Sequence, residues 1–278
     1  MYNHKKEDDM LFKTLHNGYK IPTLGTGTNT YGKVNKDFFG EINFDTNEIH
    51  SAINLGYRLI DTAIYYRNEA VIGKAIKETQ LEREELFITT KIPEKPEYSG
   101  TDDRVVSNIE SSLKNIDATY IDLYLMHFPL ETNEENLRVW KVLEKYVSMG
   151  KIKSIGVSNF NIDQLQYIID HANIKPVLNQ FQSYPGRHQQ ALIDFCKRNR
   201  IIPEAYHSLA KVSEKNKKIL SKIGKKYDKL WNQVILNYQI HEGLVVIPKS
   251  HNPINQKNNM DVFDFKLNDE DKEIIKNM

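Results

Sequence analysis

Short apolar runs alternate with amphipathic segments along almost the whole chain. In the amphipathic segments, hydrophobic residues recur three or four positions apart, as at Ile49, Ala52 and Ile53, which is the spacing of one helix face. Gly56 and Gly150 follow two of these segments, where helices commonly end. The apolar runs have the length and composition of buried strands. These runs are Ile21–Leu24, Arg58–Asp61, Leu86–Lys91, Ile121–His127, Ile152–Ser158, Pro176–Gln180, Ile201–Tyr206 and Leu244–Ile247.

Eight such strands, each followed by a helix, predict a parallel sheet closed as a (β/α)8 (TIM) barrel of the α/β class. No linker or low-complexity tract divides residues 1–278, so a single domain is expected. A doubly wound open sheet is the structural alternative, and it favours G-x-G-x-x-G after the first strand. The nearest candidate, GTGTNTYG at 25–32, has Thr30 where the third glycine would stand.

The residues around the first apolar run, MLFKTLHNGYKIP, predict a small β-hairpin ahead of the barrel. Asn17-Gly18 lies between two β-like runs, and Asn-Gly is the preferred pair in a type I′ turn. Such a hairpin is expected to cover one end of the barrel.

Charge and cysteine content exclude several classes of protein. With 38 basic and 37 acidic side chains, the formal net charge of +1 disfavours a nucleic-acid or membrane-surface binder. The single cysteine, Cys196, rules out an internal disulfide and a cysteine-based zinc site, and no metal site is expected. No apolar run approaches the ~18 residues of a membrane span, and MYNHKKEDDM lacks a signal-peptide core, so a cytoplasmic protein is expected.

Polar residues close seven of the apolar runs, at the strand ends where this barrel carries its functional groups. Each has a simple structural explanation. Asp61 and Ser158-Asn159 are candidate helix caps, although Asn68 is better placed than Asp61 to cap the following helix. Lys91 could lie in an exposed loop, and His127 could lie in the core. Their joint placement on one rim favours a functional site instead. The strand-end residues are Asp61, Lys91, His127, Ser158, Gln180, Tyr206 and Lys249.

The combination of tyrosine, lysine, aspartate and histidine indicates a specific chemistry, the reduction of a carbonyl group. A phenol with a pKa near 10 is a poor proton donor at neutral pH, and a nearby ammonium is expected to lower that pKa. A carboxylate keeps the ammonium charged, and a neutral histidine can donate a hydrogen bond to a carbonyl oxygen as negative charge develops there. Together they can reduce an aldehyde or ketone if a hydride donor binds alongside.

The motifs that carry these residues resemble those of the aldo-keto reductases. That family has G-Y-R-x-I-D-T-A-x-x-Y-x-N-E, then T-K, L-x-H and I-G-V-S-N-F after the third, fourth and fifth strands. This chain has GYRLIDTAIYYRNE, FITTKIP, DLYLMHFP and KIKSIGVSNF, with LNQ at 178–180 and IPKS at 247–250. The resemblance implies that Tyr66 donates the proton, that Asp61 and Lys91 tune it, and that His127 orients the carbonyl. Tyr65 is expected to pack or to line the rim.

The resemblance also implies a nicotinamide cofactor bound without a Rossmann fold. The residues implied to contact the nicotinamide are Gly27, Thr28, Ser158, Asn159, Gln180 and Tyr206, the last by stacking. Those implied to contact the adenosine phosphate are Lys249, Ser250 and Asn259. The family's R-x-x-E-N reads NQKNN here, so Asn255 replaces the arginine that grips the 2′-phosphate. NADPH is expected on the remaining positive charge, with Lys257 or His251 as compensating groups and NADH as the alternative.

The substrate pocket departs from the family pattern as well. Asn29 and Phe128 stand where many members have tryptophan, and LNDEDKEIIKNM ends the chain directly after the last predicted helix. These features imply an open pocket for small or varied aldehydes and ketones.

Two other functions fit the same residues. A slow or non-catalytic member can use bound cofactor as a redox sensor. A Schiff-base enzyme would need Lys91 as an uncharged nucleophile, whereas Asp61 is expected to keep it charged. A monomer acting on a small carbonyl compound is the expected form.

Overall fold

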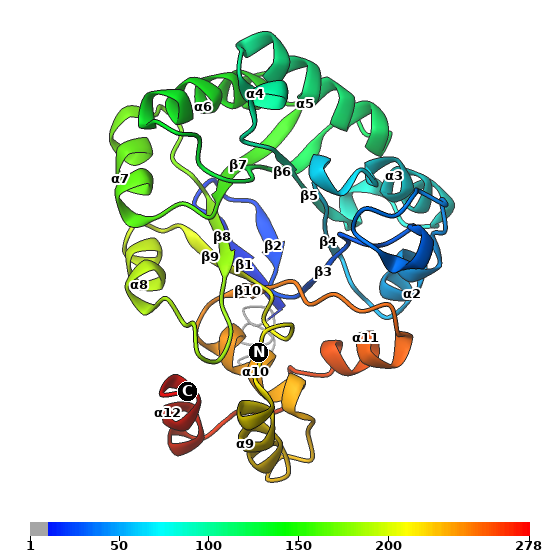
Figure 1. Ribbon diagram of the computed structural model, residues 1–278, viewed down its shortest axis with the longest axis vertical. Coiled ribbons are helices and arrows are strands. Elements are labelled where there is room, and N and C mark those ends of the chain that lie inside the picture. The colour runs from blue at the N-terminus through cyan, green and yellow to red at the C-terminus, as the bar shows by residue number, and fades with distance from the viewer. Residues whose placement is uncertain (1–10) are drawn as a thin grey trace, which may run out of the picture.

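Eight parallel strands form a nearly closed barrel that is surrounded by helices (Figure 1). The computed structural model describes residues 11–278, so the segment MYNHKKEDDM, on which the localisation prediction partly rests, lies outside the described residues. Around the barrel the strands are β3 (Gly25–Gly27), β4 (Leu59–Asp61), β5 (Phe87–Ile92), β6 (Ile121–Met126), β7 (Ile152–Ser158), β8 (Leu178–Gln182), β9 (Ile202–Tyr206) and β10 (Val245–Val246). A parallel bridge between Leu24 and Val246 joins the first strand to the last. The predicted (β/α)8 barrel is confirmed, while the extent of a single domain stays a prediction.

Most of the helices pack their apolar faces against the outside of the sheet, whereas the helices at 214–224 and 269–276 pack against the helix at 231–241. They are α2 (Asn47–Asn54), α3 (Glu69–Glu78), α4 (Pro96–Ser99), α5 (Asp102–Ile116), α6 (Asn133–Ser148), α7 (Ile162–His171), α8 (Gln190–Arg198), α9 (Glu214–Gly224), α10 (Trp231–His241), α11 (Pro253–Met260) and α12 (Asp269–Lys276). Short 3-10 helices are η1 (Val34–Lys36), η2 (Ile64–Tyr66) and η3 (Arg83–Glu85). Within residues 11–278, no helix combines the length and apolarity that crossing a lipid bilayer requires.

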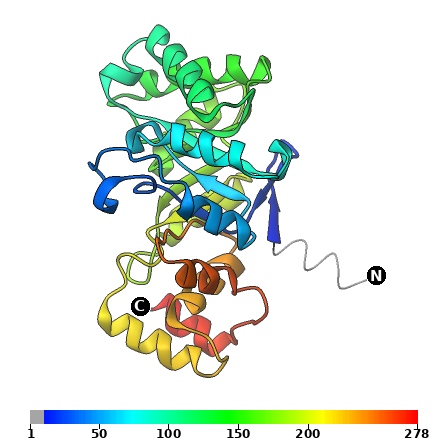
Figure 2. The same ribbon diagram turned by 90° about the vertical axis from the view of Figure 1, so that its right-hand side faces the viewer.

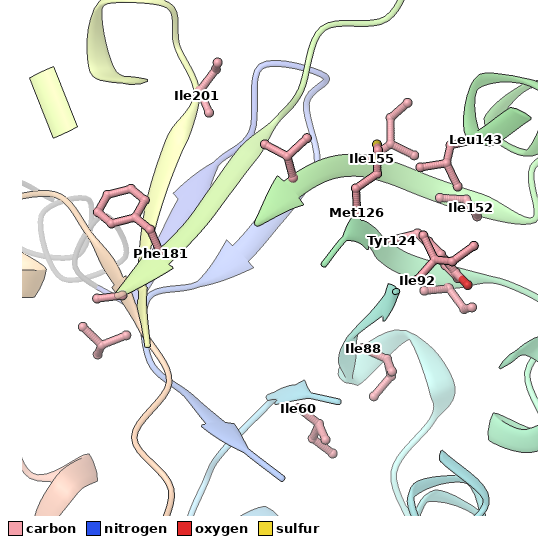
Figure 3. Packing of buried hydrophobic residues seen from close by; sticks show 14 of the residues in the cluster. Ile60, Ile88, Ile92, Tyr124, Met126, Leu143, Ile152, Ile155, Phe181 and Ile201 are labelled. Atoms are coloured by element: carbon pink, nitrogen blue, oxygen red, sulfur yellow. The ribbon is translucent and has the colours of Figure 1, made fainter. Parts of the chain in front are cut away.

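Alternation along each strand separates two hydrophobic cores. Figure 3 shows Ile60, Ile88 and Ile155 among the side chains of the outer core, between the strands and the helices. Leu59 instead packs inside the barrel, in a cluster with Phe87 and Leu125. Successive side chains of a strand point to opposite faces, so Asp61, two residues after Leu59, also faces the interior. Because of this alternation, the carboxylate of Asp61 at the end of β4 faces the barrel interior.

The predicted hairpin is present, as β1 (Phe12–Thr14) and β2 (Lys20–Pro22). Leu15 and Ile21 are buried and belong to the interior cluster, so the hairpin covers one end of the barrel. In Figure 2 it stands on the opposite side from the blue loop that follows β3.

Two details of the N-terminal prediction are wrong. The run Ile21–Leu24 is not the first barrel strand, because Ile21 pairs with β1 and the barrel strand begins at Gly25. The turn is not type I′, which needs positive φ at both central residues. Gly18 has a φ of +92°, but Asn17 is not among the residues with positive φ. Hydrogen bonds from Leu15 N to Tyr19 O and from Gly18 N to Leu15 O close a three-residue loop instead.

Candidate active site

A cavity of about 810 Å³ opens at the carboxyl ends of the barrel strands. The predicted site residues line it, with the exception of Lys91, which lies fully buried against Asp61 and Tyr66. The structure therefore brings together residues that are more than 200 positions apart in the sequence. The predicted residues on the cavity wall are Gly27, Thr28, Asn29, Asp61, Tyr66, His127, Phe128, Ser158, Asn159, Gln180, Tyr206, Lys249, Ser250 and Asn259.

A buried ion pair joins β4 to β5 next to the cavity. Lys91 Nζ donates to Asp61 Oδ1 at 2.6 Å and to the Thr62 carbonyl oxygen at 2.9 Å, and lies 3.5 Å from the Tyr66 hydroxyl oxygen. Lys91 is 0% and Asp61 2% exposed. Burial is the largest single influence and lowers the pKa of Lys91, but the charges of Asp61, Tyr66 and Glu204 and the hydrogen bond to Asp61 together outweigh it, so the net direction is upward. Lys91 is a charged, fully engaged ammonium, which argues against both an exposed loop lysine and a Schiff-base nucleophile.

Tyr66 reaches the ion pair because η2 follows β4 directly and places its last residue back over the strand. Asn68 secures this turn, donating to the carbonyl oxygens of Thr28 at 2.7 Å and Tyr31 at 3.1 Å. Asn68 stands at the N-cap position of α3, but its side chain makes no capping hydrogen bond, so its predicted role as a cap is wrong. Tyr65 lines the cavity and donates to Glu94 Oε1 at 3.1 Å. Tyr66 is therefore the tyrosine that faces Lys91.

Burial decides the protonation state of Tyr66. It raises the pKa of the phenol, Lys91 is the largest opposing influence, and Asp61 raises it further. Lys91 lowers the pKa of the phenol as expected, but burial outweighs it and the net direction is upward. At neutral pH Tyr66 keeps its proton, which a proton donor must.

His127 follows β6 and is 7% exposed at the cavity wall. Its ring centroid lies 5.8 Å from that of Tyr66, and it stacks on Phe128 at 5.1 Å. Burial, followed by the charge of Lys91, lowers the pKa of His127 well below its usual value, so the imidazole is neutral. Within the described part of the chain, Nδ1 has no hydrogen-bond partner. A buried nitrogen beside a cavity without a protein partner is free to pair with a ligand.

The polar group on β7, β8 and β9 forms a connected network. Asn159 Nδ2 donates at 3.0 Å to both Ser158 Oγ and the His127 carbonyl oxygen, and the Tyr206 hydroxyl donates to Asn159 Oδ1 at 2.8 Å. Asn161, not Ser158 or Asn159, caps α7 through its side chain. The strand-end pair is therefore free of a capping role.

The far end of the cavity holds Lys249, Ser250, Asn255 and Asn259. A Cβ on Gly27 would lie 3.3 Å from the Ile247 carbonyl oxygen, so the backbone of β3 approaches this region closely. His251 bonds instead to Glu48 and, at 2.8 Å, to Thr30 Oγ1. Neither His251 nor Lys257 belongs to the cavity wall, so the structure does not bring these two compensating candidates into it.

Several residues at the site were missed from the sequence. Phe38 and Trp231 add aromatic surface to the cavity, and each lies in a segment whose polarity resembles an ordinary loop or helix start. Glu204, on β9, is fully buried and accepts a hydrogen bond from Gln180 Nε2, which also donates to Asp61 Oδ2 at 2.9 Å. A signal for Glu204 was present, since an acid two residues before Tyr206 in an apolar run must share its face.

Comparisons with known proteins find relatives that match nearly the whole chain. The sequence profile described as "Aldo/keto reductase family" matches residues 23–278. Glyoxal reductase of Bacillus subtilis (strain 168) is 38% identical over 262 residues, covering 94% of this chain and 90% of that protein. Methylglyoxal reductase DkgA of Escherichia coli (strain K12) is 37% identical over 265 residues, covering 94% and 91%. The structure of a Bombyx mori aldo-keto reductase in complex with NADP has a TM-score of 0.84 and 32% identity, covering 95% of this chain and 91% of that one.

The lowered pKa of His127 predicts how stability depends on pH. Below about pH 6.5, the pKa of histidine in the unfolded chain, the unfolded state binds a proton that the native state does not bind. The free energy of unfolding therefore decreases as the pH is lowered. Between pH 7.5 and 5.5 we expect wild type to lose about 1.4 kcal/mol more than His127→Gln does. Urea unfolding at the two pH values measures this, and parallel losses in both proteins would contradict a neutral buried His127.

Proposed function

Since this chain belongs to the aldo/keto reductase family of oxidoreductases, we propose that it reduces small aldehydes and ketones to alcohols with NADPH, taking the proton from Tyr66. The observation that carries the proposal is the buried Lys91 ammonium, which bonds to Asp61 and lies 3.5 Å from the Tyr66 hydroxyl. This group sits beside a cavity whose wall also presents His127.

Small dicarbonyl compounds are the substrates we propose to test first. Two relatives that match over nearly their whole length are named as reductases of glyoxal and methylglyoxal. The cavity wall around Tyr66 and His127 is aromatic, since the Phe38 ring lies against Tyr66 and the Tyr65 and Phe128 rings lie against His127. Such a wall selects size weakly and leaves orientation to the hydrogen bonds at the carbonyl oxygen.

The polar groups of the cavity fit a nicotinamide nucleotide. Ser158, Asn159 and Gln180 offer amide and hydroxyl partners for a carboxamide, and Tyr206 offers an aromatic face beside them. Lys249 offers a cation for a phosphate at the other end, and the related Bombyx mori enzyme binds NADP. When bound, the reduced nicotinamide supplies the hydride.

Proton delivery follows from the residues themselves. Tyr66 donates its proton to the substrate oxygen, and the phenolate left behind is stabilised by the Lys91 ammonium. Asp61 holds that ammonium in place. Neutral His127 donates a hydrogen bond to the same substrate oxygen, where negative charge develops as the carbonyl is reduced.

Replacing Tyr66 by phenylalanine removes the proton and little else. We expect kcat for methylglyoxal reduction to fall about 100- to 10,000-fold, the usual contribution of a general acid, while NADPH still binds. Loss of nicotinamide absorbance measures turnover, and quenching of protein fluorescence measures binding.

Tyr65→Phe is the matched control, because Tyr65 also lines the cavity but bonds to Glu94. It should retain most of the activity. Equal losses in the two variants would contradict the assignment of Tyr66, and a wild type that binds NADPH but reduces no carbonyl compound would favour the redox-sensor alternative.

With Asn255 in place of an arginine, we expect weaker binding of the 2′-phosphate of NADPH. It lines the cavity, whereas a guanidinium there would form charge-assisted, bidentate bonds that an amide cannot match. We propose that NADPH is nevertheless the better cofactor, because Lys249 remains on the wall.

Asn255→Arg is expected to raise the preference for NADPH over NADH by about tenfold or more, since a charged hydrogen bond contributes roughly 1.5–3 kcal/mol. The ratio of kcat/KM for the two cofactors measures the preference. Ile254→Arg adds the same charge at an exposed position of α11 that is not on the cavity wall, and it should change the ratio little. Similar shifts in both variants would show that long-range attraction, not contact at position 255, controls the choice.

A further inference from the structure

Glu204 is a buried acid that the proton-delivery scheme above leaves without a role. It lies in β9, with Gln180 of β8 and Val245 of β10 as its register partners, and it is 0% exposed. Its interior-facing neighbours along β9 are Ile202 and Tyr206. Gln180 and Tyr206 both line the cavity, so the Glu204 carboxyl lies directly behind the cavity wall, one hydrogen bond from Gln180.

The Gln180 amide connects Glu204 to the ion pair. Nε2 of Gln180 has two hydrogens, and they go to Asp61 Oδ2 at 2.9 Å and to Glu204 Oε1. Each carboxyl group thus accepts one of the two hydrogens, and together they fix the orientation of the Gln180 amide. Gln180 Oε1 is left as the atom that can accept a hydrogen bond from a ligand in the cavity.

The charges around Glu204 do not balance when it is ionised. Those that act on it are Asp61 from β4 and Lys91 from β5, while its strand neighbours Gln180 and Val245 are uncharged. One buried ammonium then lies near two buried carboxylates. Glu204 Oε2 has no hydrogen-bond partner in the described part of the chain. Burial, followed by the charge of Asp61, raises the pKa of Glu204 to about 8.

We propose that Glu204 determines the relative affinity for oxidised and reduced nicotinamide cofactor through its own ionisation. This inference rests on the proposed function. The oxidised ring carries one more positive charge than the reduced ring, so an ionised Glu204 below the cavity favours the oxidised form. At a separation of about 10 Å, unit charges in a protein-like medium interact strongly enough to change an affinity on the order of tenfold.

Reciprocity gives a test that needs no variant. If ionised Glu204 favours oxidised cofactor, then binding of oxidised cofactor must favour ionised Glu204 and release its proton. Calorimetric titration of wild type at pH 7, 8 and 9, in buffers with different ionisation enthalpies, measures the protons released. We expect NADP⁺ to release more than NADPH, with a clear difference at pH 7 and pH 8 and a small one at pH 9. Equal release at all three pH values would overturn the inference.

A variant then assigns the proton to Glu204. Between pH 6.5 and 9 the ratio of the Kd of NADPH to that of NADP⁺ should rise on the order of tenfold in wild type and stay flat in Glu204→Gln. Glu69→Gln is the control, because Glu69 is also buried with a raised pKa but bonds to Thr90 and lies outside the cavity wall. It should behave as wild type does.

The outcomes separate the two proposals. A pH-dependent ratio that persists in Glu204→Gln overturns the inference and leaves the reductase intact. A wild type that binds neither nucleotide overturns both. If Glu204→Gln does not fold, equal proton release by wild type with the two nucleotides at all three pH values still overturns the inference.

Discussion

A charged lysine buried inside a barrel is the constraint on which the site depends. Removing one partner of such a pair costs about 3–5 kcal/mol, because the other charge is left unpaired in the interior. Here Lys91 is satisfied by Asp61 and by the Thr62 carbonyl oxygen, both contributed by the end of the adjacent strand. Asp61 stands opposite Thr89, two residues before Lys91, so parallel pairing of β4 with β5 sets the distance between the charges. The barrel supplies this register, and the chemistry we propose uses the ammonium that it holds.

The same cation acts on each group around it. It limits the rise in the pKa of Tyr66 and adds to the fall in the pKa of His127. The result is a protonated phenol beside a neutral imidazole at one cavity wall. Gln180 extends the network from Asp61 to Glu204, so the Lys91–Asp61 pair and the Glu204 carboxyl belong to one hydrogen-bonded group.

Much of this site could be predicted from the sequence, because strand periodicity and strand ends are local features. Asp61, Lys91 and His127 each end an apolar run, and parallel strands bring such ends together. What failed depended on tertiary contacts. The first barrel strand, Gly25–Gly27, has no apolar alternation, so the sequence pattern favours the preceding apolar run instead. Asn68 looks like a helix cap until Thr28 and Tyr31 approach it, and the raised pKa of Tyr66 follows from a burial that no spacing reveals.

The central claim is that the Lys91–Asp61 pair serves proton transfer and is not only a structural contact. The most direct measurement is turnover of methylglyoxal with NADPH by the double variant Asp61→Asn/Lys91→Met, which removes both charges and leaves neither unpaired. We expect a folded protein that binds NADPH but turns over at least about 100-fold more slowly than wild type. Turnover within a few-fold of wild type would show that the pair stabilises the barrel only, and that Tyr66 donates its proton without it.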